Sequence, residues 1–176
     1  MSEEIKINGT KISIVKDDLT MMDVKALVFY AKKDLNLGSG YGNAISTRGG
    51  PSIKKELEEM DKPDVTEAVV SKAGNLKAEY IIHAVGPVFQ EENIKNKLER
   101  TLENTLKTAD KNKIKDIAFP IMGAGFYGVP PKDAIKIMFE TTKKYLSNAT
   151  SIEKITFCGN DNREYRLLMS EIEILK

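Results

Sequence analysis

Two apolar runs, each followed by a glycine-rich loop, constrain the fold of this chain more than any other feature. The runs are Ala26–Ala31 and Ile117–Ile121, and a continuous apolar run is typical of a strand that is covered on both faces. The loops that follow are Gly38–Gly42 and Gly123–Gly128. Glycine lets a loop bring backbone N–H groups close to a ligand, where they can hold phosphate oxygens. Two such loops, each between a buried strand and a helix, predict a clamp around a diphosphate.

The rest of the chain alternates between strand and helix patterns. Alternating apolar residues around Asn8-Gly9 predict a β-hairpin, and apolar residues at helical spacing predict a long helix over Glu92–Asn112. The further strands that we expect are Val65–Lys72, Tyr80–Val85 and Ile152–Cys158. Further helices are expected to begin near Asn43 and at Pro51, to span Pro131–Ser147, and to run from Asp161 to the end.

This order of elements predicts the fold class. Strands that alternate with helices, with a hairpin at the start, favour an α/β layer sandwich around a mixed central sheet. We find no linker, repeat or low-complexity segment in the sequence, so we expect a single domain over residues 1–176.

Composition excludes several classes of protein. The chain is 41% hydrophobic and 30% charged, which is typical of a globular domain rather than a disordered or membrane protein. No run approaches the roughly 18 apolar residues of a membrane span. The polar start Met1–Glu4 has no apolar stretch behind it, so we expect no signal peptide. The net charge of +1 argues against a general nucleic-acid surface. With neither a signal peptide nor a membrane span expected, we predict a cytoplasmic protein.

The single cysteine and the single histidine both lie in apolar runs. Cys158 has no partner for an intramolecular disulfide, which fits a reducing compartment, and its setting favours a packed strand residue over a nucleophile. His83 follows Tyr80-Ile81-Ile82 and is expected to be structural rather than a general base. No His, Cys and carboxylate cluster has metal-ligand spacing, so we expect no metal site and no cofactor.

A third polar segment, Asp17–Thr20, follows the predicted strand Ile12–Val15. In open α/β sheets, ligands bind outside the carboxyl ends of the strands, so this segment and both glycine loops could meet at one rim. A carboxylate there could accept a hydrogen bond from an exocyclic amine such as that of adenine. Alternatively, Asp17 or Asp18 simply caps the next turn.

The second loop also matches the G-x-G-x-x-G pattern of dinucleotide-binding Rossmann domains. That pattern requires a helix to start within it, early in the domain. Here Val129-Pro130-Pro131 blocks immediate entry into a helix, because proline lacks an N–H and restricts the residue before it. The loop also lies late in the chain, so the sequence disfavours a Rossmann fold.

Four ordered segments of the chain resemble those of macro domains. They are Asp18-Leu19-Thr20, Leu37–Ile45, Tyr80–Pro87 and Phe119–Pro130, with Ala26-Leu27-Val28 between the first two. The resemblance extends over residues 5–175, effectively the whole chain. It implies a three-layer α/β/α sandwich with a pocket for ADP-ribose.

The resemblance also implies roles for individual residues. Asp18 would bind the adenine amine, with the backbone of Leu19 beside it. The first loop would lie near the diphosphate and the distal ribose, and the second would hold the diphosphate through backbone N–H groups. The loop residues so assigned are Gly38, Ser39, Gly40, Tyr41, Gly42, Gly123, Ala124, Gly125, Phe126 and Tyr127.

The chain departs from the family at positions that matter for catalysis. Hydrolytic macro domains of the commonest type carry Asn-Ala-Ala-Asn where this chain has Phe29-Tyr30-Ala31-Lys32, so Lys32 replaces the asparagine that contacts the distal ribose. Lysine has no acceptor and cannot orient a water as an asparagine carbonyl does. Gly42 stands where some hydrolases have an acidic residue. Lys32 could instead attract an anionic group such as a terminal phosphate, or could be a solvated surface lysine; no catalytic residue is assigned.

A further departure concerns the adenine side. Asn162 stands where many relatives place an aromatic residue against adenine, and asparagine cannot stack comparably. Asn160 lies beside it, and Tyr165 could supply the missing ring. We expect Asp161 to cap the helix that follows.

The sequence therefore predicts a protein that binds ADP-ribose or a derivative of it, free or attached to a protein. The alternative is a hydrolase that acts on ADP-ribosyl esters, O-acetyl-ADP-ribose or ADP-ribose 1''-phosphate without the usual catalytic asparagine. A second alternative is an RNA or poly-adenylate module, which the near-neutral charge and the absence of an aromatic row disfavour.

Overall fold

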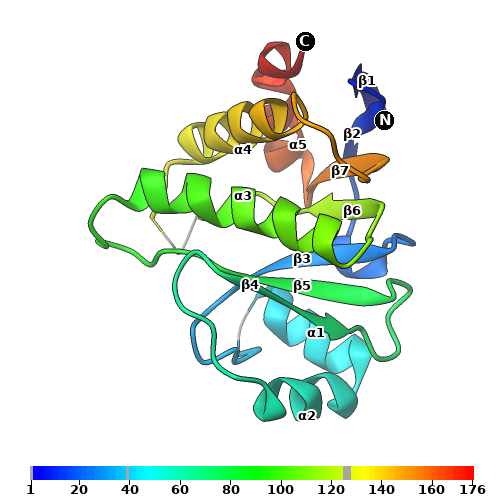
Figure 1. Cartoon of the computed structure of the whole chain (residues 1–176), viewed down its shortest axis with the longest axis vertical. Helices are drawn as coiled ribbons and strands as arrows, with labels where there is room; N and C mark the ends of the chain where they lie inside the picture. The colour runs from blue at the N-terminus through cyan, green and yellow to red at the C-terminus, as the bar shows by residue number, and fades with distance from the viewer. Residues whose placement is uncertain (1, 39, 125–127) are drawn as a thin grey trace.

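The computed structural model describes residues 2–38, 40–124 and 128–176 (Figure 1). Their strands form a seven-stranded sheet in the order β1-β2-β7-β6-β3-β5-β4. The strands are β1 (Ser2–Ile7), β2 (Thr10–Lys16), β3 (Ala26–Ala31), β4 (Ala68–Lys72), β5 (Tyr80–Val85), β6 (Asp116–Phe119) and β7 (Lys154–Gly159). The five inner strands are parallel to one another, and the edge strands β1 and β4 are antiparallel to their neighbours. The predicted mixed sheet is confirmed.

Helices cover both faces of this sheet. The α-helices are α1 (Tyr41–Gly49), α2 (Pro51–Glu59), α3 (Ile94–Lys111), α4 (Pro131–Tyr145) and α5 (Asn162–Ser170). Two short 3-10 helices are η1 (Leu19–Met21) and η3 (Ile172–Leu175). Helices α3, α4 and α5 pack into one hydrophobic cluster with one face of the sheet, whereas α1 and α2 pack into a second cluster with the other face. Figure 1 shows α3 and α4 side by side, far from α2. The three-layer α/β/α sandwich is therefore confirmed.

Strand β3 explains why its sequence is apolar without a break. All six of its residues are buried. Ala26, Val28 and Tyr30 face the cluster of α3, α4 and α5, while Leu27, Phe29 and Ala31 face the cluster of α1 and α2. Side chains alternate between the faces of a sheet, so a central strand between two helical layers needs apolar residues at every position.

Several predicted boundaries are corrected by local backbone geometry. Strand β4 begins at Ala68 rather than at Val65, because a turn closed by the hydrogen bond from Glu67 N–H to Asp64 O (3.0 Å) precedes it. Strand β6 ends at Phe119 rather than at Ile121, since Pro120 has no N–H for a ladder. Helix α3 begins at Ile94, two residues after the predicted start.

The prediction of one closing helix to the chain end is wrong. Helix α5 ends at Ser170, and Glu171 leaves the helical conformation before η3 begins. Leu168, Ile172 and Leu175 are all buried in the same cluster, so the break lets both short helices turn apolar residues inward.

The single histidine and the single cysteine are packed residues of the sheet. His83 is 0% exposed, its Nε2 lies 2.8 Å from Ser71 Oγ, and its ring meets the Phe29 ring edge-on at 6.1 Å. Burial lowers the pKa of His83 from 6.5 to about 3, so the ring is neutral. Burial likewise raises the pKa of the Cys158 thiol to about 12, and Sγ donates to Asp17 O at 3.1 Å. Neither group is suited to acid–base or nucleophilic chemistry at neutral pH.

Candidate functional site

The carboxyl ends of the five parallel strands meet at one edge of the sheet. The loops 17–25, 32–40, 86–93, 120–130 and 160–161 leave the sheet there. This edge brings together segments that are more than a hundred residues apart in sequence. The predicted site residues at this edge that the structure describes are Asp18, Leu19, Lys32, Gly38, Gly40, Tyr41, Gly42, Gly123, Ala124 and Asn160. Ser39, Gly125, Phe126 and Tyr127 lie outside the described residues.

Asp18 is held in a fixed orientation at this edge. Its Oδ1 accepts hydrogen bonds from Thr20 N–H (3.0 Å) and from the Thr20 hydroxyl (2.7 Å), so it caps η1 as one of the two sequence alternatives predicts. Its Oδ2 accepts from Arg48 Nη1 at 2.6 Å. A carboxylate offers about four acceptor positions, so one position on Oδ2 stays open with respect to the described residues.

The backbone next to this carboxylate supplies a donor. The N–H of Leu19 donates no hydrogen bond to any described residue, although the Leu19 side chain is buried. Asp18 and Leu19 therefore present an acceptor and a donor side by side. Capping and ligand binding are compatible here, because the cap uses only Oδ1.

The electrostatics of the site keep Asp18 ionised. Partial burial by itself raises the pKa of Asp18, but the hydrogen bonds from Thr20 and Arg48 and the positive charge of Arg48 outweigh it, so the pKa lies below its usual value. The carboxylate is thus an acceptor throughout the neutral pH range.

Arg48 is the residue that sequence reasoning missed. It lies in the last turn of α1, on the same helix face as Tyr41 and Ile45, because positions i, i+4 and i+7 align along a helix. Ile45 is fully buried, which turns this face toward η1. The spacing from Ile45 could have indicated that Arg48 lies on the buried face of α1. Only the packing of α1 against η1 brings its guanidinium into contact with the Asp18 carboxylate.

The first glycine loop ends as the N-terminus of α1. Gly40 has a φ of 56°, and a Cβ there would meet no atom within 4 Å. No side chain caps the helix, and the N–H groups of Tyr41 and Gly42 donate to no described residue. Uncapped N–H groups at a helix N-terminus attract anions. The loop can therefore hold a negatively charged group.

Gly42 and Tyr41 also have packing roles. A Cβ at Gly42 would lie 2.9 Å from the backbone carbon of Leu37, so this glycine permits a close approach of two backbone segments. Tyr41 packs against the cluster of α1 and α2, and its hydroxyl is buried without a partner among the described residues. Burial raises the pKa of Tyr41, and Cys158, Glu164 and Asp18 add to that shift.

The second glycine loop is pinned at its base. Val129 N–H donates to Gly123 O at 3.0 Å, and Ala124 forms a parallel bridge with Val129. Gly128 has a φ of +86°, and a Cβ there would lie 2.3 Å from the ring of Phe89. Phe89 is 62% exposed and comes from the loop after β5, so an aromatic ring lies against one end of the glycine loop. Residues 125–127 lie outside the described residues.

Lys32 follows the end of β3 and is exposed. Its neighbour Lys33 pairs with Asp64 at 3.0 Å, whereas Lys32 forms no ion pair with any described residue. Its carbonyl accepts from Leu35 N–H at 2.9 Å, which closes a turn at the rim. Lys32 thus supplies an uncompensated positive charge beside the first glycine loop.

At the end of β7, Asp161 caps α5 as predicted. Its side chain accepts from Glu164 N–H at 2.8 Å, and Glu164 in turn accepts from Asn160 N–H at 2.6 Å. Glu164 thus ties the residue before the cap to the first turn of α5. Asn162 is the first residue of α5 and is exposed. Tyr165 packs against the hydrophobic cluster of α3, α4 and α5.

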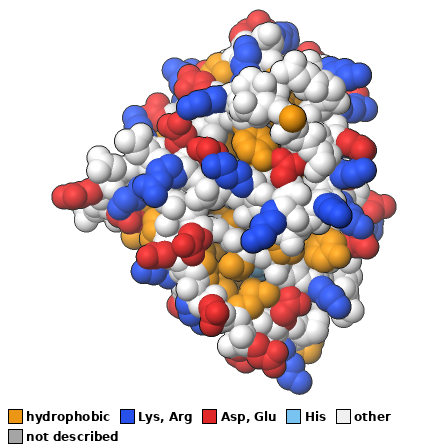
Figure 2. Space-filling view, viewed as in Figure 1, with side chains coloured by type: hydrophobic (Ala, Val, Ile, Leu, Met, Phe, Trp, Pro, Cys, Tyr) orange, Lys and Arg blue, Asp and Glu red, His pale blue; other side chains and the backbone are white. Residues whose placement is uncertain are grey.

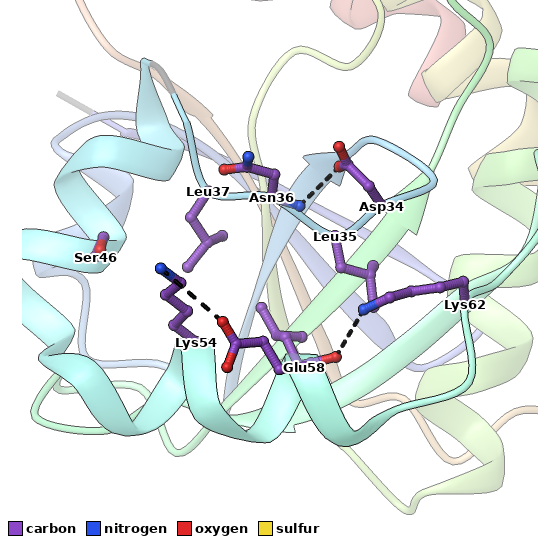
Figure 3. A pocket seen from close by; sticks show the side chains of 9 residues that line it. Asp34, Leu35, Asn36, Leu37, Ser46, Lys54, Glu58 and Lys62 are labelled. Atoms are coloured by element: carbon purple, nitrogen blue, oxygen red, sulfur yellow. Dashed lines mark hydrogen bonds and ion pairs between the residues drawn. The ribbon is translucent and has the colours of Figure 1, made fainter.

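A separate cavity of about 360 Å³ lies behind the first glycine loop, between residues 34–37 and α2 (Figure 3). Leu35, Leu37 and Leu57 contribute its apolar lining. Lys62 Nζ donates to Leu57 O at 3.1 Å, and Lys54 lies 3.9 Å from Glu58. The ammonium groups around this cavity are therefore engaged by the protein itself.

The surface shows no region of a single charge on the face that Figure 2 presents, where basic and acidic side chains are interspersed. Among the described residues, no three His, Cys, Asp or Glu side chains are grouped to hold a metal ion. Within the same residues, no helix is both long and apolar enough to span a bilayer.

Comparison with known proteins identifies the family of the chain. The model of the family described as Macro domain matches residues 30–138. A macro domain-containing protein of Caldanaerobacter subterraneus is 36% identical over 94% of this chain and 97% of its own length. ADP-ribose glycohydrolase MACROD2 of Xenopus laevis is 32% identical over 89% of this chain, which spans 39% of that protein.

Solved structures are similar over nearly the whole chain. A variant of the Oceanobacillus iheyensis macrodomain, with ADPR, superposes with a TM-score of 0.93 at 24% identity and covers 99% of this chain and 98% of its own. The Trypanosoma brucei macrodomain in complex with ADP-ribose gives a TM-score of 0.84 at 26% identity, covering 90% of this chain and 68% of its own.

The fold is a three-layer α/β/α sandwich, and its candidate site lies at the carboxyl ends of the parallel strands. The family match and the relatives make the class specific: the chain belongs to the macro domain family.

Proposed function

We propose that this chain binds ADP-ribose, free or attached to a protein, at the carboxyl edge of its sheet. The observation that carries the proposal is the pair of groups at Asp18 and Leu19. The open position on Asp18 Oδ2 accepts hydrogen bonds, and the unpaired Leu19 N–H donates one. Adenine offers the matching pair on its Watson–Crick edge, an amino donor next to the N1 acceptor.

The diphosphate would lie between the two glycine loops. The uncapped N-terminus of α1 supplies N–H groups and a favourable dipole for one phosphate. The second loop, from Gly123 through Ala124 to Gly125, Phe126 and Tyr127, would supply backbone donors on the opposite side. Membership of the macro domain family, and the ADP-ribose bound to the Trypanosoma brucei relative, support this assignment.

Lys32 would lie at the distal end of the ligand. Its uncompensated charge suits an anionic substituent on the distal ribose, such as a terminal phosphate. Asn160 and Asn162 would flank the adenine end, where Asn162 replaces an aromatic residue and provides no stacking surface.

Calorimetry with ADP-ribose, AMP, ADP and NAD tests the proposal. We expect ADP-ribose to bind most tightly, and Asp18→Asn to weaken binding about tenfold or more, the effect of losing a hydrogen bond to a charged group. Asp17→Asn is the matched control, since among the described residues the Asp17 carboxylate accepts only from Asp18 N–H (2.7 Å). No heat and no thermal shift with millimolar ADP-ribose would refute the function.

The similarity to an ADP-ribose glycohydrolase favours a second candidate, hydrolysis of ADP-ribose derivatives. The described side chains supply little for it, because His83 and Cys158 are buried and inert and Lys32 replaces an asparagine. A substrate-assisted route, in which the bound diphosphate orients water, needs no further side chain. Incubation with mono-ADP-ribosylated protein and with O-acetyl-ADP-ribose, followed by mass spectrometry, decides between binding alone and turnover.

A further inference from the structure

Asp18, Thr20 and Arg48 form a closed ring of hydrogen bonds. Arg48 Nη1 donates to Asp18 Oδ2 at 2.6 Å and also to the Thr20 hydroxyl oxygen. The Thr20 hydroxyl donates in turn to Asp18 Oδ1 at 2.7 Å. Each of the three side chains thus contacts the other two, and the ring joins η1 to the last turn of α1.

This ring determines which acceptor position Asp18 presents to a ligand. Because the Thr20 oxygen accepts from Arg48, the Thr20 proton is directed at Asp18 Oδ1. Thr20 N–H occupies the other position on that oxygen. Arg48 occupies one position on Oδ2, so the carboxylate can neither rotate nor offer Oδ1, and a single oriented position remains.

The exposure of the three side chains supports a role beyond packing. Thr20 is 1% exposed, as expected of a residue that anchors the ring. Asp18 and Arg48 are 37% and 44% exposed, and an exposed ion pair of this kind contributes little to stability. An arginine that adds little to the fold yet makes two contacts with the residues at the base site is placed to serve the ligand.

We propose that Arg48 is a positioning residue for base recognition, which holds Asp18 so that its Oδ2 accepts from the 6-amino group of the purine. The inference rests on the proposed function, because it assigns the base of ADP-ribose to Asp18. It assigns the preference for a 6-aminopurine to the ring of Asp18, Thr20 and Arg48 rather than to Asp18 alone.

Two ligands and a double-mutant cycle test this inference. The ligands are ADP-ribose and its analogue with purine in place of adenine, which has hydrogen instead of the 6-amino group. Binding is measured by calorimetry for the wild type, Arg48→Met, Asp18→Asn and the double variant. Arg100→Met is the matched control, since Arg100 is exposed on α3, away from the rim, and thermal unfolding checks that each variant is folded.

We expect Arg48→Met to weaken ADP-ribose binding about tenfold and to leave binding of the purine analogue within about twofold. In the Asp18→Asn background, Arg48→Met should cause no further loss of affinity for ADP-ribose, because the free-energy effects of two residues that act through one contact do not add. Arg48→Lys, which keeps the charge, should recover most of the lost affinity, and Arg100→Met should change neither ligand.

The other outcomes overturn the inference in distinct ways. An equal loss for both ligands that persists with Asp18→Asn would show that Arg48 contacts the ligand elsewhere. Unchanged or higher affinity of Arg48→Met for ADP-ribose would show that Arg48 is neutral or competes with the base. In both cases the wild type still binds ADP-ribose, so the proposed function stands; a wild type that binds neither ligand would refute both.

Discussion

The buried His83 makes stability depend on pH in a way that can be calculated. Its pKa is 6.5 in the unfolded chain and about 3 in the folded protein, because burial disfavours the charged ring. Between these values the unfolded chain binds one proton more than the folded one. His83 therefore contributes no penalty above pH 6.5, and the free energy of unfolding falls as the pH drops from 6.5 toward 3.

The magnitude follows from proton linkage. Each pH unit within the window changes the free energy of unfolding by about 1.4 kcal/mol. The slope reaches this value only below pH 6.5, where the unfolded histidine is fully protonated, so acidification from pH 6.5 to 4.5 should cost about 2 kcal/mol through His83 alone. That is a large share of the roughly 5–15 kcal/mol that stabilises a typical domain.

Urea unfolding of the wild type and of His83→Gln at pH 6.5, 5.5 and 4.5 measures this term. Glutamine can place a polar atom near Ser71, where Nε2 lies at 2.8 Å, but it does not titrate. Carboxylates contribute equally to both proteins, and His83 is the only histidine, so the difference between the two slopes belongs to it. The variant should be less stable at pH 6.5 and should lose about 1 kcal/mol less per pH unit than the wild type.

Parallel slopes for the two proteins would refute this reasoning. So would an NMR titration of the folded protein in which the His83 ring protonates near pH 6.5. Either result would mean that solvent reaches the ring within the sheet.

Three further predictions concern other groups. Gly128→Ala forces a residue with a side chain to a φ of +86° and places its Cβ against Phe89, so we expect the free energy of unfolding in urea to fall by about 1–2 kcal/mol. The control Gly38→Ala should cost far less, because its Cβ would meet only the flexible side chain of Asn36. Cys158, whose pKa burial raises to about 12, should react with an aromatic disulfide reagent at pH 8 only after denaturant is added, and rapid reaction of the folded protein would contradict its burial. Partial burial by itself raises the pKa of Asp110, but hydrogen bonds from Tyr145, Thr150 and Ser151 outweigh it, so the pKa lies below its usual value. The stabilisation by the Asp110 carboxylate is therefore complete above about pH 4 and is lost at lower pH. Asp110→Asn should cost about 1–2 kcal/mol in urea unfolding at pH 7, and this variant should lose less stability on acidification than the wild type.

The sequence was sufficient where a local pattern determines the structure. The continuous apolar run of β3 predicts a strand covered on both faces, since every position must be apolar there. The Asn8-Gly9 pair predicts the hairpin of β1 and β2, which the structure shows. The position of Asp161 before a helical pattern predicts the cap of α5, and its side chain does accept from Glu164 N–H.

The sequence was not sufficient where contacts come from packing between distant segments. Arg48 reaches Asp18 only because α1 packs on η1, across thirty residues of chain. Gly42 is required by the close approach of the Leu37 backbone. The break at Glu171 depends on which residues the core of α3 and α4 can accept, which no local pattern reveals.

The pairing of β2 with β7 has a consequence for how the site is assembled. Ile12 lies opposite Ile155 in this pairing, so two segments distant in sequence must meet before the strand ends that carry Asp18 and Asn160 become neighbours. Contacts of such long sequence separation form slowly. The rim exists only where β2 and β7 are paired, because that pairing brings the segments after Lys16 and Gly159 together. A ligand that bridges these strand ends would therefore stabilise two segments that are far apart in sequence.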